Sequence, residues 1–196
     1  MKIYGDGNSG NCLKVKWVCD RLALPYDWIA VDTMKRETRT PHFLALNSAG
    51  QVPVVELDDG RTLAQSNAII RYLARGSALI PADAFAAAKM DEWLFWEQYS
   101  HEPYIAVCRF QMVYLGKPAT ELDPDKVQRG YAALARMEQH LAGTRFLVGD
   151  AFSLADVALL AYSRVAHEGG FDLARYASIR RWIAEGETQL GLPPAR

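Results

Sequence analysis

Cysteine is scarce in this chain of 196 residues: there are three, and no two of them form a CxxC pair. An odd number of cysteines at such spacing predicts neither a disulfide framework nor a cysteine metal site. The four histidines are scattered along the sequence and add no metal-binding motif. We therefore expect a protein that uses no metal.

The sequence also lacks a strong net charge and a long apolar run. The formal net charge is −1, which argues against partners held by bulk electrostatics, such as nucleic acid or an anionic membrane surface. No run approaches the roughly 18 apolar residues of a membrane span, and the first residues have no apolar signal core. We expect a cytoplasmic protein with no membrane partner and no nucleic-acid partner.

Half of the chain is hydrophobic (50%), which is enough to bury a sizeable core. Turn residues gather between Gly76 and Asp83 and mark a boundary. Almost all that follows reads as helix, apart from loops near 116–124, 143–152 and 169–171. Ser153 and Asp156 predict a capped start for one of these helices, although the third position of a capping box usually holds Glu or Gln.

A polar loop near the N-terminus carries groups suited to chemistry. Residues 2–4 predict a short buried strand, and apolar residues between 15 and 23 recur at helical spacing. Ser9, Asn11 and Cys12 therefore fall at a strand-to-helix turn. Free backbone N–H groups at a helix start favour a negative charge, such as a thiolate. Simple capping of the helix by Ser9 or Asn11 is the alternative interpretation.

A second polar pattern follows. Residues 52–57 predict a strand entered through Val52–Pro53, where we expect a cis peptide bond. Residues 58–61 predict a hairpin turn that leads to a return strand. The next segment predicts a helix with a polar start at Gln65 and Ser66.

This order of strand, helix, strand, proline turn, hairpin and helix resembles the thioredoxin-like domain of cytosolic glutathione transferases of the bacterial type. Val52–Pro53 is similar to the family's cis-proline turn, and Gln65-Ser66 to its glutathione clamp, where many bacterial relatives have Glu before Ser. The resemblance implies an α/β thioredoxin-like domain over residues 1–76, which binds glutathione. It implies an all-α domain over residues 84–196, which shapes the electrophile site, and a homodimer with helices near 65–75 and 84–114 at its interface.

The resemblance places Ser9 where serine-type members carry the catalytic serine and beta-class members a cysteine. A free thiol has a pKa of about 8.5, so the enzyme must stabilise the glutathione thiolate, which a hydroxyl donor can do. Asn11 is the second candidate, because Ser9-Gly10-Asn11 resembles the Thr-Pro-Asn loop of bacterial members with disulfide-reductase activity. Cys12 is the third; it lies three residues past the usual position, and packing in the first helical turn is its alternative.

For glutathione itself, the resemblance assigns Gln65 and Ser66 to the γ-glutamyl group and the backbone of Val52, before Pro53, to the cysteinyl amide. Gln51 and the 35–39 region, including Thr38, are expected to meet the glycine carboxylate. The basic residues of that region also suit a solvated loop.

In the helical domain, aromatic residues crowd positions 93–114, and most are expected in the core or an interface. Pro103 is expected to kink or break its helix. Three polar or aromatic side chains near it are the candidates for contact with the electrophile: His101, Tyr104 and Arg109.

Together these features predict a glutathione transferase that conjugates or exchanges glutathione with small electrophilic or disulfide substrates, in a role such as detoxification. A glutathione-dependent disulfide reductase and a non-catalytic binding protein of the same fold are the alternatives. A resemblance to maleylacetoacetate isomerases is weaker, because their Ser-Ser-Cys loop is not matched by residues 9–12.

Overall fold

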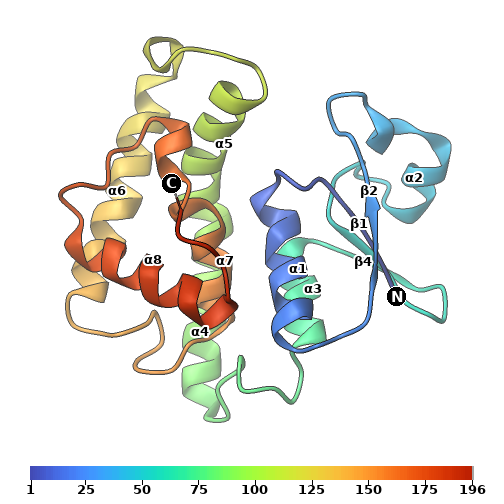
Figure 1. Ribbon diagram of the computed structural model, residues 1–196, viewed down its shortest axis with the longest axis horizontal. Coiled ribbons are helices and arrows are strands. Elements are labelled where there is room, and N and C mark those ends of the chain that lie inside the picture. The colour runs from blue at the N-terminus through green and yellow to red at the C-terminus, as the bar shows by residue number, and fades with distance from the viewer. Residues whose placement is uncertain (196) are drawn as a thin grey trace. The chain divides into compact units, whose positions relative to one another are not determined.

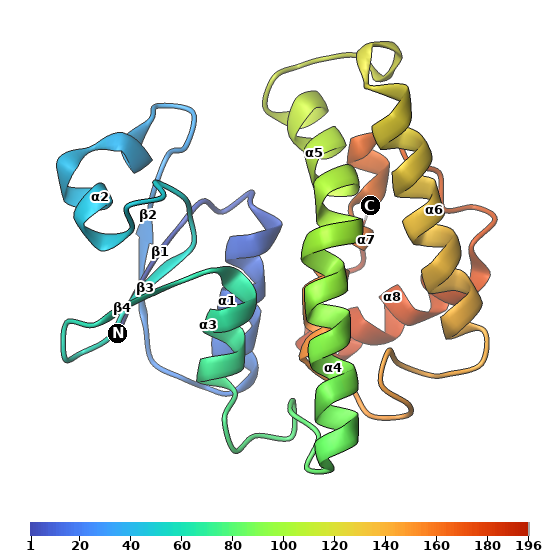
Figure 2. The same cartoon turned by 180° about the vertical axis from the view of Figure 1, so that it is seen from behind.

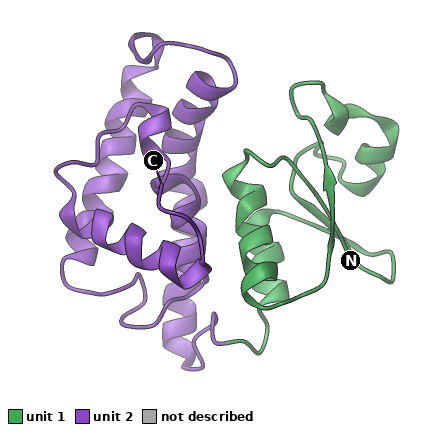
Figure 3. Cartoon of the chain, viewed as in Figure 1, with its two compact units in different colours: residues 1–77 green, residues 78–196 purple. Residues whose placement is uncertain are grey.

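The computed structural model describes residues 1–195, which divide into two compact units with a boundary between Ser77 and Ala78 (Figure 3). The first unit mixes strands and helices, and the second is helical. Both parts of the expected fold class are therefore confirmed. In the described part of the chain, no helix is long and apolar enough to cross a membrane.

The first unit is built on a four-stranded mixed sheet in the order β2-β1-β3-β4. Strand β1 runs parallel to β2 and antiparallel to β3, and β3 and β4 are antiparallel. Helices α1 and α3 lie side by side on one face of this sheet, and α2 lies on the other (Figures 1 and 2). The elements are β1 (Lys2–Gly5), α1 (Gly10–Arg21), β2 (Asp27–Ala30), α2 (Pro41–Leu46), β3 (Val54–Glu56), β4 (Thr62–Ala64) and α3 (Ser66–Leu73).

Apolar residues at alternating and helical spacing explain this arrangement. Ile3 of the central strand β1 is fully buried, and Val15 and Val18 of α1 are buried as well. On the α2 side, Tyr4 and Phe43 belong to a small core cluster, and their rings meet edge to face. Both faces of the sheet are thus covered, and the loops at the ends of its strands remain for function.

The second unit contains five α-helices and several short helical turns in its described part. Helix α7 lies among the others (Figure 1), and all ten of its residues are buried. This agrees with a sequence in which nearly every residue of the helix is apolar. The helices are α4 (Ala84–Trp96), α5 (Glu102–Val113), α6 (Pro124–Leu141), α7 (Leu154–Ser163) and α8 (Ala177–Leu190).

The sequence predicted that Pro103 kinks or breaks its helix, and the regular α-helical pattern is indeed interrupted just before it, although the chain stays helical. A π-helical turn over Glu97–His101 joins α4 to α5, and Pro103 follows within the first two residues of α5. Figure 2 shows α4 and α5 as one long rod. A proline lacks the N–H that would bond one turn back, and the wider π-helical turn takes up the resulting change in hydrogen bonding.

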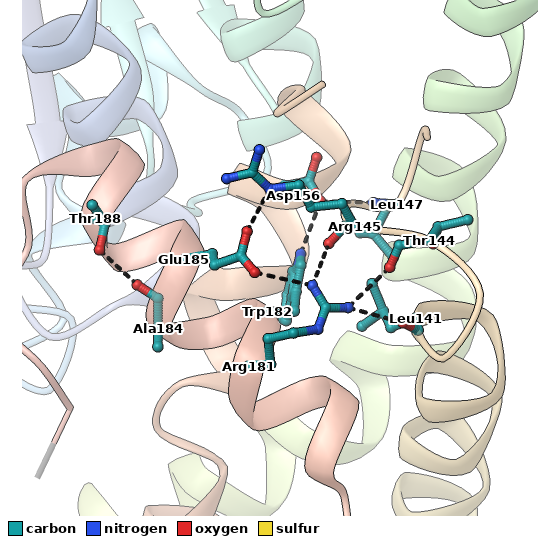
Figure 4. A network of polar contacts seen from close by, with 10 residues as sticks. All are labelled: Leu141, Thr144, Arg145, Leu147, Asp156, Arg181, Trp182, Ala184, Glu185 and Thr188. Carbon is teal, nitrogen blue, oxygen red and sulfur yellow. Dashed lines mark hydrogen bonds and ion pairs between the residues drawn. The ribbon is translucent and has the colours of Figure 1, made fainter. Parts of the chain in front are cut away.

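The predicted polar start of α7 is confirmed. The carboxylate of Asp156 accepts hydrogen bonds from the Ser153 backbone N–H at 2.9 Å and from its hydroxyl at 3.0 Å. It also accepts from the Leu147 N–H at 2.9 Å and from the indole N–H of Trp182 at 2.8 Å (Figure 4). Asp156 therefore joins the start of α7 to the preceding loop and to α8, which exceeds the local capping role that the sequence indicated.

Candidate functional site

The loop between β1 and α1 holds the first candidate, Ser9. Its backbone occupies the N-cap position, with φ −79° and ψ 119°, and its carbonyl accepts from the N–H groups of Cys12 and Leu13. Its side chain makes no capping hydrogen bond. The capping interpretation is therefore wrong for the Ser9 hydroxyl, which is half-buried at the helix start.

Cys12 is fully buried in the first turn of α1. Burial raises the pKa of its thiol to about 11, although hydrogen bonds from the Ser9 side chain and the Asp6 N–H act in the opposite direction. A Cβ at Gly5 would lie 2.6 Å from the Trp28 ring and 3.2 Å from the Cys12 Cβ, so Gly5 allows this close packing. A buried thiol with a raised pKa is a poor nucleophile near neutral pH.

Asn11 connects the loop to the second polar pattern. Its side-chain oxygen Oδ1 accepts a hydrogen bond from the Ser66 hydroxyl at 3.1 Å. The same oxygen accepts from Nζ of Lys14 at 2.8 Å. The start of α1 and the start of α3, which are 55 residues apart in sequence, are thereby joined through one amide group.

The proline turn and the clamp have unusual backbone geometry. The Val52–Pro53 peptide bond is cis, as the sequence predicted. Gln65, just before α3, has φ 69° and ψ 110°, a region that a residue with a side chain rarely occupies. Strain of this kind costs about 1–3 kcal/mol and is concentrated at functional sites. Ser66 follows as the first residue of α3, where free N–H groups favour an anion.

Thr38 and Gln51 lie on segments that contact each other. Thr38 is buried in a 3-10 turn, and the neighbouring Arg39 guanidinium donates to the Ala49 carbonyl at 3.3 Å. Gly50 has φ +62°, and a Cβ there would collide with the Arg39 guanidinium. The carbonyl of Gln51 accepts from the Asn47 side chain at 2.8 Å, and Gln51 itself is exposed. That Thr38 and Gln51 bind the glycine carboxylate of glutathione stays a prediction.

Tyr4 does not contribute to the loop. Its ring belongs to the core cluster, and its hydroxyl donates to Glu56 at 2.8 Å. Burial, together with this bond to Glu56, raises the pKa of the phenol. The Tyr4 side chain therefore packs on the α2 face of the sheet and is not a candidate donor to a thiolate.

The three electrophile candidates all make contacts inside the helical unit. His101 is fully buried, with Nε2 3.0 Å from the Ser163 hydroxyl. Arg109, also buried, donates to Glu168 at 2.6 Å. The Tyr104 hydroxyl accepts from the Arg129 guanidinium at 3.3 Å, and its ring is partly exposed. Of the three, Tyr104 alone has surface left for a small molecule.

Lys14 is a residue that sequence reasoning missed. A signal was present: it lies three positions after Asn11, so both side chains share one face of α1.

Among residues 1–195, no group of three or more histidine, cysteine, aspartate or glutamate side chains is arranged to hold a metal ion.

A mixed sheet with a cis-proline turn, followed by a helical unit, defines a thioredoxin-like N-terminal domain with an all-α C-terminal domain. Residues 8–75 match the family model described as glutathione S-transferase, N-terminal domain. Residues 117–185 match the model described as glutathione S-transferase, C-terminal domain. The chain belongs to the glutathione S-transferase family and is an enzyme of the transferase class.

Individual relatives agree with this assignment. Glutathione S-transferase 3 of Zea mays is 35% identical over 167 residues, which cover 80% of this chain and 73% of the maize protein. A glutathione S-transferase of Xanthomonas campestris is 28% identical over 207 residues, covering 98% of this chain and 97% of that protein. The crystal structure of a glutathione S-transferase from Pseudomonas fluorescens Pf-5 has a TM-score of 0.92 at 48% identity, and covers 95% of this chain and 94% of that one.

Proposed function

We propose that the enzyme transfers glutathione to small electrophilic or disulfide substrates and that Ser9 donates a hydrogen bond to the glutathione thiolate. The observation that carries this proposal is the Ser9 hydroxyl, which stands at a helix start without a capping role. A donor and a helix start both favour a negative charge at the same position. The family supports glutathione as substrate, and a cytoplasmic role in detoxification is proposed on that ground.

The clamp supports the binding half of this proposal. Ser66 and the strained Gln65 would hold the γ-glutamyl group, and the backbone of Val52, turned by the cis bond, would meet the cysteinyl amide. The bond between Asn11 and Ser66 keeps the clamp next to the Ser9 loop. One tripeptide would thus extend from α3 to the start of α1.

Ser9, Asn11 and Cys12 are not equally suited to donate to the glutathione thiolate. Ser9 is preferred as the thiolate donor because its hydroxyl is not used as a cap and its one partner among the described residues is the Cys12 thiol, a weak acceptor that a glutathione thiolate would replace. Asn11 is second, since its Oδ1 is occupied by Ser66 and Lys14 and only its amide N–H group is suited to a thiolate. Cys12 is third, because burial raises the pKa of its thiol to about 11.

Disulfide reduction is the second candidate function, favoured by the resemblance of Ser9-Gly10-Asn11 to the Thr-Pro-Asn loop of family members with disulfide-reductase activity. Conjugation produces a thioether, whereas reduction of a mixed disulfide releases a thiol and forms glutathione disulfide. Product analysis with a chlorodinitrobenzene-type electrophile and with a mixed disulfide of glutathione separates the two activities.

Glutathione is expected to raise the melting temperature. At one hundred times its Kd, a ligand that binds only the folded state stabilises it by about 2.7 kcal/mol. For a domain of this size, that corresponds to a shift of about 5–10 °C. Differential scanning calorimetry measures it, with cysteinylglycine, which lacks the γ-glutamyl group, as the control. An unchanged melting temperature at 10 mM glutathione would count against the proposal.

A homodimer is proposed on the same family ground, and one surface supports it. Phe85, Phe95 and Tyr99 lie along α4 and the π-helical turn that follows, with exposures of 75%, 76% and 83%. Large exposed apolar side chains in one stripe mark an interaction surface. A two-fold dimer would bury the same stripe on both subunits.

We expect Phe95→Arg to weaken the dimer at least about tenfold, because each buried Phe contributes about 1.5–3 kcal/mol. Sedimentation velocity at micromolar concentration measures the change. Leu115→Arg is the matched control, because Leu115 is 50% exposed but lies beyond this stripe. A wild-type protein that sediments only as a monomer would contradict the proposal.

A further inference from the structure

An open pocket lies at the end of the first unit that is away from the Ser9 loop. It is formed by the β3–β4 hairpin, by residues that follow α1 and by the C-terminal end of α3, and its volume is about 480 Å³. Sites for small molecules commonly have volumes of about 300–1,000 Å³. The pocket therefore has room for a small molecule. Its apolar lining consists of Leu24, Pro25, Leu57 and Leu73.

The pocket is separate from the candidate glutathione site. The bond between Asn11 and Ser66 holds the starts of α1 and α3 together, whereas the pocket lies where both helices end (Figure 2). Helix α1 has 12 residues, and a helix rises about 1.5 Å per residue, so its two ends are about 18 Å apart. The pocket is thus about one helix length from the residues proposed to hold glutathione.

The charged groups around the pocket almost balance, with one cation left over. The carboxylate of Asp58 is 2.8 Å from the Met1 ammonium group, and that of Asp59 is 2.6 Å from the Arg61 guanidinium. The remaining charged side chain is that of Arg75, which has no ion pair among residues 1–195. The two ion pairs cancel, so the pocket keeps the single positive charge of Arg75.

Arg75 is held in place without the use of its side-chain hydrogen-bond donors. Its guanidinium lies over the Tyr72 ring, 4.4 Å from the ring centroid. A guanidinium has five N–H groups, and stacking on an aromatic face does not occupy them. Within the described part of the chain, neither these groups nor the Tyr72 hydroxyl donates to a protein acceptor. Two neighbouring side chains of the pocket thus have donors that a ligand can use.

We propose that this pocket is a second small-molecule site, which takes a monocarboxylate with an apolar body. A guanidinium can present two parallel N–H groups to a carboxylate, and the Tyr72 hydroxyl can donate a further hydrogen bond. The apolar body would pack on Leu24, Leu57 and Leu73. A neutral molecule leaves the charge of Arg75 unmatched and a dianion exceeds it, so a single carboxylate suits the pocket.

The test uses octanoate as the probe and follows its titration by heteronuclear NMR of the backbone amides. Signals of the β3–β4 hairpin and of the end of α3 are expected to shift, while those at the start of α1 stay in place. Octanol, the neutral analogue, is expected to bind at least about tenfold more weakly, because it lacks the charge-assisted hydrogen bond to Arg75. Octanol binding as tight as that of octanoate would overturn the inference, and so would the absence of shifts at the pocket.

Three variants assign the binding to named side chains. Arg75→Gln is expected to raise the Kd for octanoate about tenfold, and Tyr72→Phe about threefold, since a neutral hydrogen bond contributes less than a charged one. Arg21→Gln is the matched control, because Arg21 is exposed in the last turn of α1 and does not line the pocket; its Kd is expected to stay within about twofold. Equal losses in Arg75→Gln and Arg21→Gln would indicate a general effect of charge and overturn the inference.

Two further measurements separate this pocket from other sites. Saturating glutathione is expected to change the Kd for octanoate less than about twofold, and displacement of octanoate by glutathione would overturn the inference. A protein that binds octanoate at Arg75 but binds no glutathione would overturn the proposed function alone. Sedimentation velocity of Arg75→Gln is expected to match that of the wild type. A change in oligomeric state would assign Arg75 to a contact between subunits and would also overturn the inference.

Discussion

Ser9→Ala is expected to lower the turnover of glutathione conjugation about 100-fold while changing the Kd for glutathione less than about twofold. Removal of a single positioned donor from a charge-stabilising site typically costs about 10²–10³ in kcat. The hydroxyl matters chiefly to the charged sulfur and little to the peptide that carries it. The half-buried position of Ser9 at the start of α1, with no capping bond, motivates this expectation.

Ser9→Ala is also expected to shift the pH dependence of the rate toward higher pH. A donor to the thiolate lowers the pKa of bound glutathione, so its removal raises that pKa. Near neutral pH, the variant then holds mostly thiol, and its rate rises with pH over a range in which the wild-type rate is already constant. Ultraviolet absorbance of the bound thiolate, followed against pH, reports the same change without turnover.

Cys12→Ser and Asn11→Ala are the comparison variants. Cys12→Ser is expected to have little effect on kcat, because this thiol is fully buried and burial raises its pKa to about 11. Asn11→Ala is expected to act mainly on glutathione binding. A pH profile of Ser9→Ala identical to that of the wild type would remove Ser9 from the mechanism. A larger loss of turnover in Asn11→Ala would make the amide the principal donor.

Local patterns made much of the first unit predictable. The turn at residues 5–10, the cis bond at Val52–Pro53 and the polar start of α3 each follow from a few adjacent residues whose backbone preferences are strong. The α/β and all-α divisions follow from the same patterns read over longer stretches. What these patterns specify is backbone geometry, and in this chain the backbone geometry was the part predicted best.

Side-chain partners were less predictable, because they come from distant segments. Gly5 lies close to both Cys12 and Trp28 of β2, and the link between Asn11 and Ser66 spans 55 positions. His101 and Arg109 were expected to face the electrophile, yet each bonds to a residue far along the sequence. His101 contacts Ser163, 62 positions later, and Arg109 contacts Glu168, 59 positions later. The π-helical turn before Pro103 was missed for a related reason, since no local pattern predicts where a helix widens instead of ending.

Asp156→Asn is expected to destabilise the helical unit by more than the loss of an ordinary helix cap. Burial raises the pKa of this carboxyl, while hydrogen bonds from Leu147, Trp182 and Ser153 act in the opposite direction. Three of its four donors are N–H groups, which cannot accept. An asparagine at this position would turn its own NH₂ toward a donor, leaving buried groups unpaired.

The expected loss is about 3 kcal/mol, the size of one buried charge-assisted hydrogen bond together with an unsatisfied donor. For a chain of this length, the melting temperature is expected to fall by about 6–12 °C. Calorimetry measures the change in melting temperature. The control is Asp150→Asn, at an exposed position in the preceding loop. Every residue of helix α7 is buried, and Asp156 lies in its first turn, so loss of the bonds to Leu147 and Trp182 also loosens the attachment of the helix to the preceding loop and to α8. A loss below about 1 kcal/mol, or one equal to that of Asp150→Asn, would mean that Asp156 does no more than cap its own helix.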